Sequence, residues 1–204
     1  MNANQKPDPR RRMKNLVALA LGTLALAAAG CLPTSLNPLY ETKDLTFDPA
    51  LLGTWGSDEE TWTFEKGEDQ AYKLTIAPKD GRAAAFEAHL FKLGDASWLD
   101  IYPGDEAAKD LNNGYVQVML CPTHAFLKVT GTKPNLTLVN MDLKWLLDFL
   151  TKHPKATPHH IVAKEGVVLT GSTAELRAFV REHLKTEGAW NSDPLKLEPK
   201  TAKR

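Results

Sequence analysis

The sequence predicts a β-rich α+β fold, in which an antiparallel barrel or strongly curved sheet is accompanied by two packed helices. First, apolar residues from Asp48 onward alternate with polar ones, which is the period of half-buried strands. Second, turn-forming residues such as Pro78-Lys79-Asp80-Gly81 separate consecutive runs, as in antiparallel hairpins. Third, the period lengthens to that of an amphipathic helix within residues 142–152 and 173–186.

The strand pattern is clearest where Trp62 and Phe64 face one side and the threonines beside them face the other. Because successive side chains of a strand point to opposite faces, this alternation predicts a half-buried strand. Pro122 predicts a bend or an edge, since proline cannot donate to a strand ladder. Residues 103–113 are polar and predict a long loop. Further strands are predicted at residues 72–76, 86–90, 97–102, 115–120, 124–129, 135–141, 161–163 and 167–169.

Both predicted helices have an apolar stripe and a boundary signal. The first ends near Pro154, because proline breaks a helix. The second begins at Ser172 and Glu175, which have the spacing of a capping box. The stripes consist of Leu143, Leu146, Leu147 and Leu150 in the first helix and of Leu176, Phe179, Val180 and His183 in the second.

The first 30 residues have the organisation of a secretory signal peptide. A basic leader with three consecutive arginines and Lys14 precedes an apolar segment at residues 16–29, which ends in small residues. A helix of these 14 residues extends about 21 Å, which is too short for a hydrocarbon core of about 30 Å. We therefore expect cleavage of this segment rather than a transmembrane anchor.

The run Ala28-Ala29-Gly30-Cys31 resembles the lipobox of bacterial lipoproteins. The resemblance implies cleavage before Cys31, a diacylglycerol on its sulfur and a further acyl chain such as palmitate on the new amino terminus. Two or more acyl chains hold a protein stably on a membrane, whereas one binds only marginally. Leu32 stands where an aspartate would favour inner-membrane retention in enterobacteria, so the expected location is the bacterial cell envelope, at the outer rather than the inner membrane. Cleavage without lipidation is the alternative.

The chain without its leader is long enough for one domain. We expect a lipidated tether at 31–48, a single β-rich domain at 49–190 and a disordered tail at 191–204. Of the 25 basic and 25 acidic residues, the first 30 positions hold five and one, so 20 and 24 remain and the mature chain has a net charge of −4. The mature chain contains no basic cluster, which excludes nucleic acid as an expected partner.

Lipidation of Cys31 would leave Cys121 as a lone thiol, so no intrachain disulfide is expected. Cys121 ends an apolar run, which favours a buried and inert thiol. His124 follows three residues later, and a nucleophilic cysteine needs a nearby base, so a thiol hydrolase or redox centre is the alternative. Residues three apart on a continuous strand point to opposite faces, so only a bend at Pro122 would bring the two together.

No pattern predicts a catalytic, metal or cofactor site. His159 and His160 are adjacent and would point to opposite faces of a strand, whereas metal ligands converge. Glu59 and Glu60 fit an exposed turn better than a carboxylate pair for acid–base catalysis. The sequence contains no nucleophile elbow, phosphate-binding loop or dinucleotide fingerprint.

Gly53-Thr54-Trp55 follows a predicted single turn at 49–52. This resembles the G-x-W signature of lipocalins and related calycin barrels. Over residues 48–153 the resemblance implies an eight-stranded antiparallel barrel with Trp55 at its closed end, and the helix after Ser172 is an addition to that pattern. Residues 51–65 also resemble bacterial envelope lipoproteins.

Aromatic residues that recur at strand spacing predict a packed core. The alternative is a barrel cavity that holds one small apolar ligand. Trp98, Asp100 and Tyr102 share a predicted strand face beside the long loop, and they are the candidates for the mouth of that cavity. The aromatic residues concerned are Trp55, Trp62, Phe64, Tyr72 and Phe86.

The function expected from the sequence is non-catalytic binding of a small apolar ligand by a lipid-anchored envelope lipoprotein, with acyl chains on Cys31 as the link to the membrane. A structural or assembly partner at the outer membrane is the first alternative, and an envelope hydrolase is the second. An open barrel cavity would favour ligand binding, and a filled core with an exposed apolar patch would favour the partner.

Overall fold

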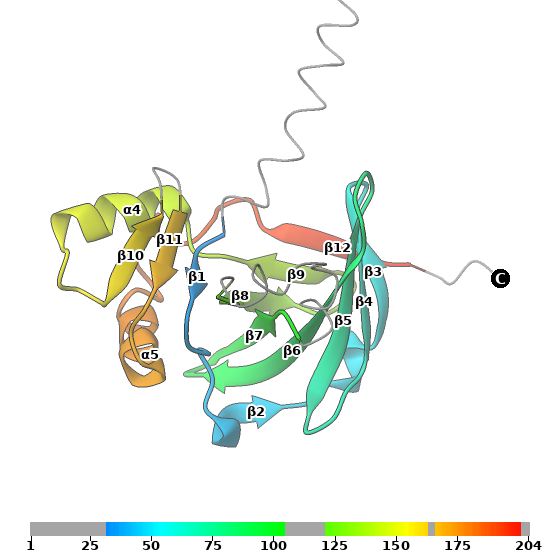
Figure 1. Ribbon diagram of the computed structural model, residues 1–204. Helices are drawn as coiled ribbons and strands as arrows, with labels where there is room; N and C mark the ends of the chain where they lie inside the picture. Colours follow the sequence, from blue (N-terminus) through cyan, green and yellow to red (C-terminus); the bar gives the residue numbers. More distant parts are fainter. Residues whose placement is uncertain (1–31, 105–120, 163–165, 201–204) are drawn as a thin grey trace, which may run out of the picture. The chain divides into compact units, whose positions relative to one another are not determined.

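The computed structural model describes residues 32–104, 121–162 and 166–200. In this part of the chain eight antiparallel strands form a closed barrel (Figure 1). Strands β3 to β9 pair in sequence order, and β12 lies between β9 and β3 and closes the ring. The predicted antiparallel barrel with two helices is therefore confirmed. The strands are β3 Gly53–Gly56, β4 Glu60–Lys66, β5 Ala71–Pro78, β6 Ala84–Leu93, β7 Ala96–Tyr102, β8 His124–Gly131, β9 Leu136–Val139 and β12 Leu195–Pro199.

The register of the first hairpins follows from the alternation in the sequence. Trp62 pairs with Ile76, and Phe64 pairs with Leu74. Paired residues of neighbouring strands project to the same face, so these apolar side chains meet inside the barrel. The predicted strand at 115–120 and most of the predicted loop at 103–113 lie outside the described residues.

The barrel interior is packed with hydrophobic side chains, each no more than 7% exposed. The predicted aromatic core is confirmed for Trp55, Trp62, Phe64 and Tyr72, and the partly buried Phe86 packs against it. The other buried members are Leu51, Leu74, Ala88, Leu90, Leu99, Ile101, Leu127, Leu136, Leu138 and Leu197.

The G-x-W run joins a short turn to the barrel. Gly53 has φ +117°, a conformation that residues with a side chain rarely adopt. It follows the 3-10 turn η2, Pro49–Leu51, which Asp48 caps by accepting a hydrogen bond from the backbone of Ala50. The indole Nε1 of Trp55 donates to the Leu51 carbonyl over 2.8 Å and ties this turn to β3.

A second layer packs outside the barrel wall. It contains helices α4, Leu143–Lys152, and α5, Thr173–Glu182, with strands β10, His159–Val162, and β11, Gly166–Leu169 (Figure 1). Strand β1, Thr34–Ser35, connects the layers, because it pairs with both β8 and β11. The core of this layer includes Leu39, Phe91, Leu93, Trp98, Phe126, Met141, Leu146, Leu150, Val167, Leu169, Leu176, Phe179 and Val180.

Both helices begin where the sequence predicts. Asp142 accepts a hydrogen bond from the Trp145 backbone, and Ser172 and Glu175 form the capping box. The sequence predicts a second helix that reaches residue 186, whereas α5 ends at Glu182, since the backbone of the C-cap residue His183 leaves the helical conformation.

The predicted tether is wrong for its described residues, 32–48. Strand β1 is part of the sheet, Leu39 is fully buried, and β2, Leu45–Thr46, pairs with β6. The 3-10 turn η1, Thr42–Asp44, precedes β2. Strands of two residues are too short to show a period, so the sequence carries no sign of them.

The predicted disordered tail is wrong for residues 195–199. These residues form β12 and pair with β3 and β9. The predicted tail is rich in lysine and proline, a composition typical of disordered segments. Within β12 only Leu197 is buried, and its neighbours Lys196 and Glu198 face solvent. Two apolar residues, Leu195 and Leu197, among charged ones are a weak strand signal.

Candidate functional site

The predicted candidates Trp98, Asp100 and Tyr102 lie on the outer face of β7. Trp98 and Asp100 are fully buried, and Tyr102 is half-buried. Their neighbours Leu99 and Ile101 project into the barrel. The expectation that the three form the mouth of a barrel cavity is therefore wrong, because they face away from the barrel interior, and Trp98 belongs to the core of the second layer.

Asp100 holds two segments on this face. Its Oδ1 lies 2.6 Å from Nδ1 of His124, and its Oδ2 accepts a hydrogen bond from the Leu39 backbone over 3.0 Å. The ring of Tyr102 stacks on His124 at 4.4 Å. The arrangement attaches residues 34–46 to the barrel wall, since a buried carboxylate needs such partners.

A second polar link joins the same segment to α5. Arg177 is only 4% exposed, donates to the Leu39 carbonyl over 3.1 Å, and lies 2.7 Å from a carboxylate oxygen of Asp44. Glu41 lies 3.6 Å from it on the other side. Arg177 is thus paired with the carboxylates of Asp44 and Glu41, which indicates a structural role for these charged groups.

Tyr40 and His89 stack beside this link, with ring centroids 4.6 Å apart. Burial raises the pKa of Tyr40 to about 12, with the negative charges of Asp100 and Glu87 adding to the effect. Burial lowers the pKa of His89, whose Nε2 lies 3.3 Å from Glu87. A cavity of about 430 Å³ borders Glu87 and His89, which are paired with each other, and it is also lined by residues of β5 and β6 that belong to the barrel core.

The expected buried thiol is wrong. Cys121 is exposed and lies in irregular backbone before β8, not in a strand that faces the core. His124, the suggested base, is bound to Asp100 instead. The thiol hydrolase therefore has no support from the described side chains.

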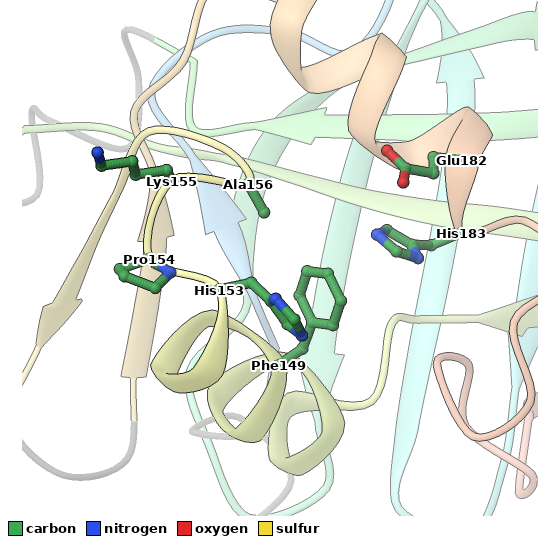
Figure 2. A pocket seen from close by; sticks show the side chains of 7 residues that line it. All are labelled: Phe149, His153, Pro154, Lys155, Ala156, Glu182 and His183. Carbon is green, nitrogen blue, oxygen red and sulfur yellow. The ribbon is translucent and has the colours of Figure 1, made fainter.

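A pocket of about 570 Å³ lies where α4 and α5 end (Figure 2). Phe149 and His153 line it from α4, and Glu182 and His183 line it from α5. The loop Pro154–Ala156 completes the wall. Because His153 and His183 are the C-cap residues of their helices, two helix ends border one cavity.

Phe149 is the centre of this pocket. Its ring centroid lies 4.7 Å from His153 and 4.7 Å from His183. Behind it, Trp145 stacks at 5.0 Å and Phe179 lies at 6.0 Å. The pocket wall is therefore a set of aromatic faces supported by the core of the second layer.

His183 is buried and held in place by hydrogen bonds. It is 7% exposed, and its Nδ1 lies 3.2 Å from the Thr186 hydroxyl. Burial lowers its pKa, so the neutral imidazole is favoured. The Trp190 indole also donates to the His183 carbonyl over 2.9 Å.

The lining of this pocket combines aromatic rings with ionisable groups. Its lining has aromatic rings, one carboxylate and one amino group, but no hydroxyl or thiol nucleophile. Among the residues that the structure describes, no group of three or more His, Cys, Asp or Glu side chains could hold a metal ion.

Sequence analysis missed the pocket because its residues come from two helices 30 positions apart. His183 was assigned to the inward stripe of its helix, and Phe149 and His153 had no distinguishing pattern. The helix-ending Pro154 and the two histidines near the helix ends were the available signals.

No protein-family model, curated protein or solved structure matches the chain. In the described part of the chain, no helix is both long and apolar enough to cross a membrane.

Proposed function

We propose that the chain is a lipid-anchored cell-envelope lipoprotein that binds a small ligand with an apolar body, without catalysis, in the pocket between the ends of α4 and α5. The observation that carries the proposal is the aromatic lining of this pocket. The barrel serves as the scaffold that holds the second layer.

The size and lining of the pocket support ligand binding. Small-molecule sites typically have volumes of about 300 to 1,000 Å³ and largely apolar walls with a few polar groups. The pocket has about 570 Å³, and Phe149 with the two histidine rings supplies the apolar surface. The barrel interior is the weaker candidate, because buried side chains pack throughout it.

A steric block tests this site. Ala156 is exposed and lines the pocket, so Ala156→Trp fills it without disturbing a core. Ala178 is exposed on α5 and does not line the pocket, so Ala178→Trp is the matched control. We expect mass spectrometry of extracts from the purified protein to find a bound small molecule in the wild type and in the control, but not in Ala156→Trp. Equal recovery from all three would reject this site.

The lipid anchor is supported by the basic leader, the short apolar segment and the run that ends at Cys31. We expect the exported protein to carry acyl chains on Cys31 and to fractionate with membranes. Cys31→Ser should move it to the soluble fraction, and intact mass should show loss of the acyl groups. A membrane-bound Cys31→Ser protein would contradict the anchor.

A structural or assembly partner is the second candidate. Among the described strands, β10 pairs only with β11, and it exposes Ile161 and Val162, which are 38% and 47% accessible. Exposed apolar residues on an edge strand are typical of surfaces that pair with another chain. In that case Ile161→Lys should abolish an isolated complex, while Ala156→Trp should leave it intact.

A further inference from the structure

We infer that the ligand of the α4–α5 pocket is an organic cation, an amine or quaternary ammonium attached to an apolar group. The inference rests on the proposed function, since it names the chemical class that this same pocket would accept. Three independent features of the lining support it: the aromatic faces, the charge of the wall and the helix ends.

The aromatic faces suit a cation. The face of an aromatic ring carries partial negative charge and attracts an ammonium group within about 6 Å of the centroid. Phe149 packs against Trp145 and lies 4.7 Å from both His153 and His183, so that the rings of Phe149, His153 and His183 together form the aromatic wall of the pocket. Burial lowers the pKa of His183, which disfavours a positive charge on this ring.

The two oppositely charged side chains of the wall, Glu182 and Lys155, point in different directions relative to the pocket. Figure 2 shows the Glu182 carboxylate beside His183, on the side of the pocket, whereas the amino group of Lys155 points away from the other lining side chains. A bound ammonium would therefore meet the carboxylate of Glu182 before it met the charge of Lys155. An anionic ligand would meet the charges in the opposite order.

The helix ends favour the same sign of charge. The C-terminal end of a helix carries partial negative charge from its last carbonyl groups. Both α4 and α5 end at this pocket. At the end of α4, Pro154 has no N–H to donate to the Leu150 carbonyl four residues earlier. Two such ends at one cavity attract a cation and disfavour an anion.

Three probes of similar size and different charge test the inference: benzylamine, benzyl alcohol and benzoate. Binding to the full exported protein in a non-ionic detergent is measured by ligand-observed NMR titration at pH 7. We expect benzylamine to bind about tenfold more tightly than benzyl alcohol, and benzoate to bind most weakly. Ala156→Trp should abolish binding of all three.

Glu182→Gln provides the charge test. We expect it to weaken benzylamine binding about three- to fivefold and to leave benzyl alcohol binding unchanged. Glu187→Gln makes the same charge change at an exposed residue outside the lining, and it should have no effect on either probe.

The outcomes separate the two proposals. Benzyl alcohol that binds as well as benzylamine, or benzoate that binds best, would overturn the cation inference and leave the pocket as a ligand site. Equal losses in Glu182→Gln and Glu187→Gln would overturn it as well. If none of the probes binds, the proposed site and the cation inference both fail.

Discussion

At the scale of single residues, the structure places several polar side chains in an environment that differs from the predicted one. Asp100 has the sequence neighbours expected of a ligand contact, yet it is fully buried and bound to His124 and to the Leu39 backbone. Cys121 differs in the opposite sense, because the sequence predicts a buried thiol and the structure exposes it. The burial of Asp100 and the exposure of Cys121 do not follow from local sequence, because they depend on which distant segments pack against each residue.

Asp100→Asn tests the structural role of this carboxylate. The variant keeps the shape but removes the charge that faces His124, so we expect a loss of about 2 kcal/mol or more in the free energy of unfolding. Urea denaturation measures it. Asp95 is exposed in the turn before β7, so Asp95→Asn should change the free energy of unfolding by less than about 0.5 kcal/mol. Equal effects of the two substitutions would show that Asp100 does not hold the N-terminal segment.

His183 gives a pH-dependent prediction. Burial lowers its pKa in the folded protein, whereas in the unfolded chain it titrates near the ordinary value of about 6.5. The unfolded chain therefore binds more protons in acid, so this contribution to stability is present above about pH 6.5 and is lost as the pH falls through the lowered folded value. We expect His183→Gln to lose less stability than the wild type between pH 7.5 and pH 5.

The matching control is His160→Gln, which replaces an exposed histidine on β10. Urea midpoints at both pH values should show the wild-type dependence in this variant. If His183→Gln retained the full wild-type dependence, the assignment to His183 would be wrong.

At the scale of elements, the helices were the most predictable parts of the chain. The apolar stripe of residues 142–152 and the capping box at Ser172 contain their own local evidence, and α4 and α5 begin where that evidence puts them. Helix ends were harder, since α5 stops at Glu182 where His183 leaves the helical conformation. Strands β1 and β2 could not be predicted from the sequence, because two residues are too few to show a period.

Ser172→Ala tests the capping box. The hydroxyl accepts from the Glu175 backbone, and the Glu175 carboxylate accepts from the Ser172 backbone. Removal of the hydroxyl leaves an orphan N–H at the start of α5, so we expect a loss of about 1 kcal/mol in the free energy of unfolding. Thermal and urea unfolding measure this loss. Ser192→Ala, at an exposed position outside the helices, should change stability by only a few tenths of a kcal/mol.

At the scale of the whole molecule, closure of the barrel depends on a strand from the far end of the chain. Strand β12 fills the gap between β3 and β9, so that paired residues 142 and 144 positions apart, Glu198 with Gly56 and Pro199 with Trp55, complete one wall. Closure removes exposed strand edges, which would otherwise offer unpaired backbone groups to other chains. The second layer is held in a similarly long-range way, by Arg177 and Asp100 acting on residues 39–44.

Leu197→Ala tests whether β12 is part of the core. Leu197 is fully buried in the barrel interior, so we expect its truncation to cost about 2 to 5 kcal/mol and to lower the thermal midpoint. Lys196 is exposed on the same strand, and Lys196→Ala should change the free energy of unfolding by less than about 0.5 kcal/mol. A Leu197→Ala protein as stable as the Lys196→Ala protein would mean that β12 does not belong to the packed barrel.

The sequence by itself determined the β-rich class, most strands of the barrel, the two helices and the aromatic residues of the interior, because period and capping are local properties of the chain. Tertiary structure alone decided that the ends of the domain are part of the sheet, that Asp100 is buried, and that Phe149, His153, Glu182 and His183 surround one pocket. These features depend on contacts between segments that are distant in the sequence, and local sequence patterns do not predict such contacts.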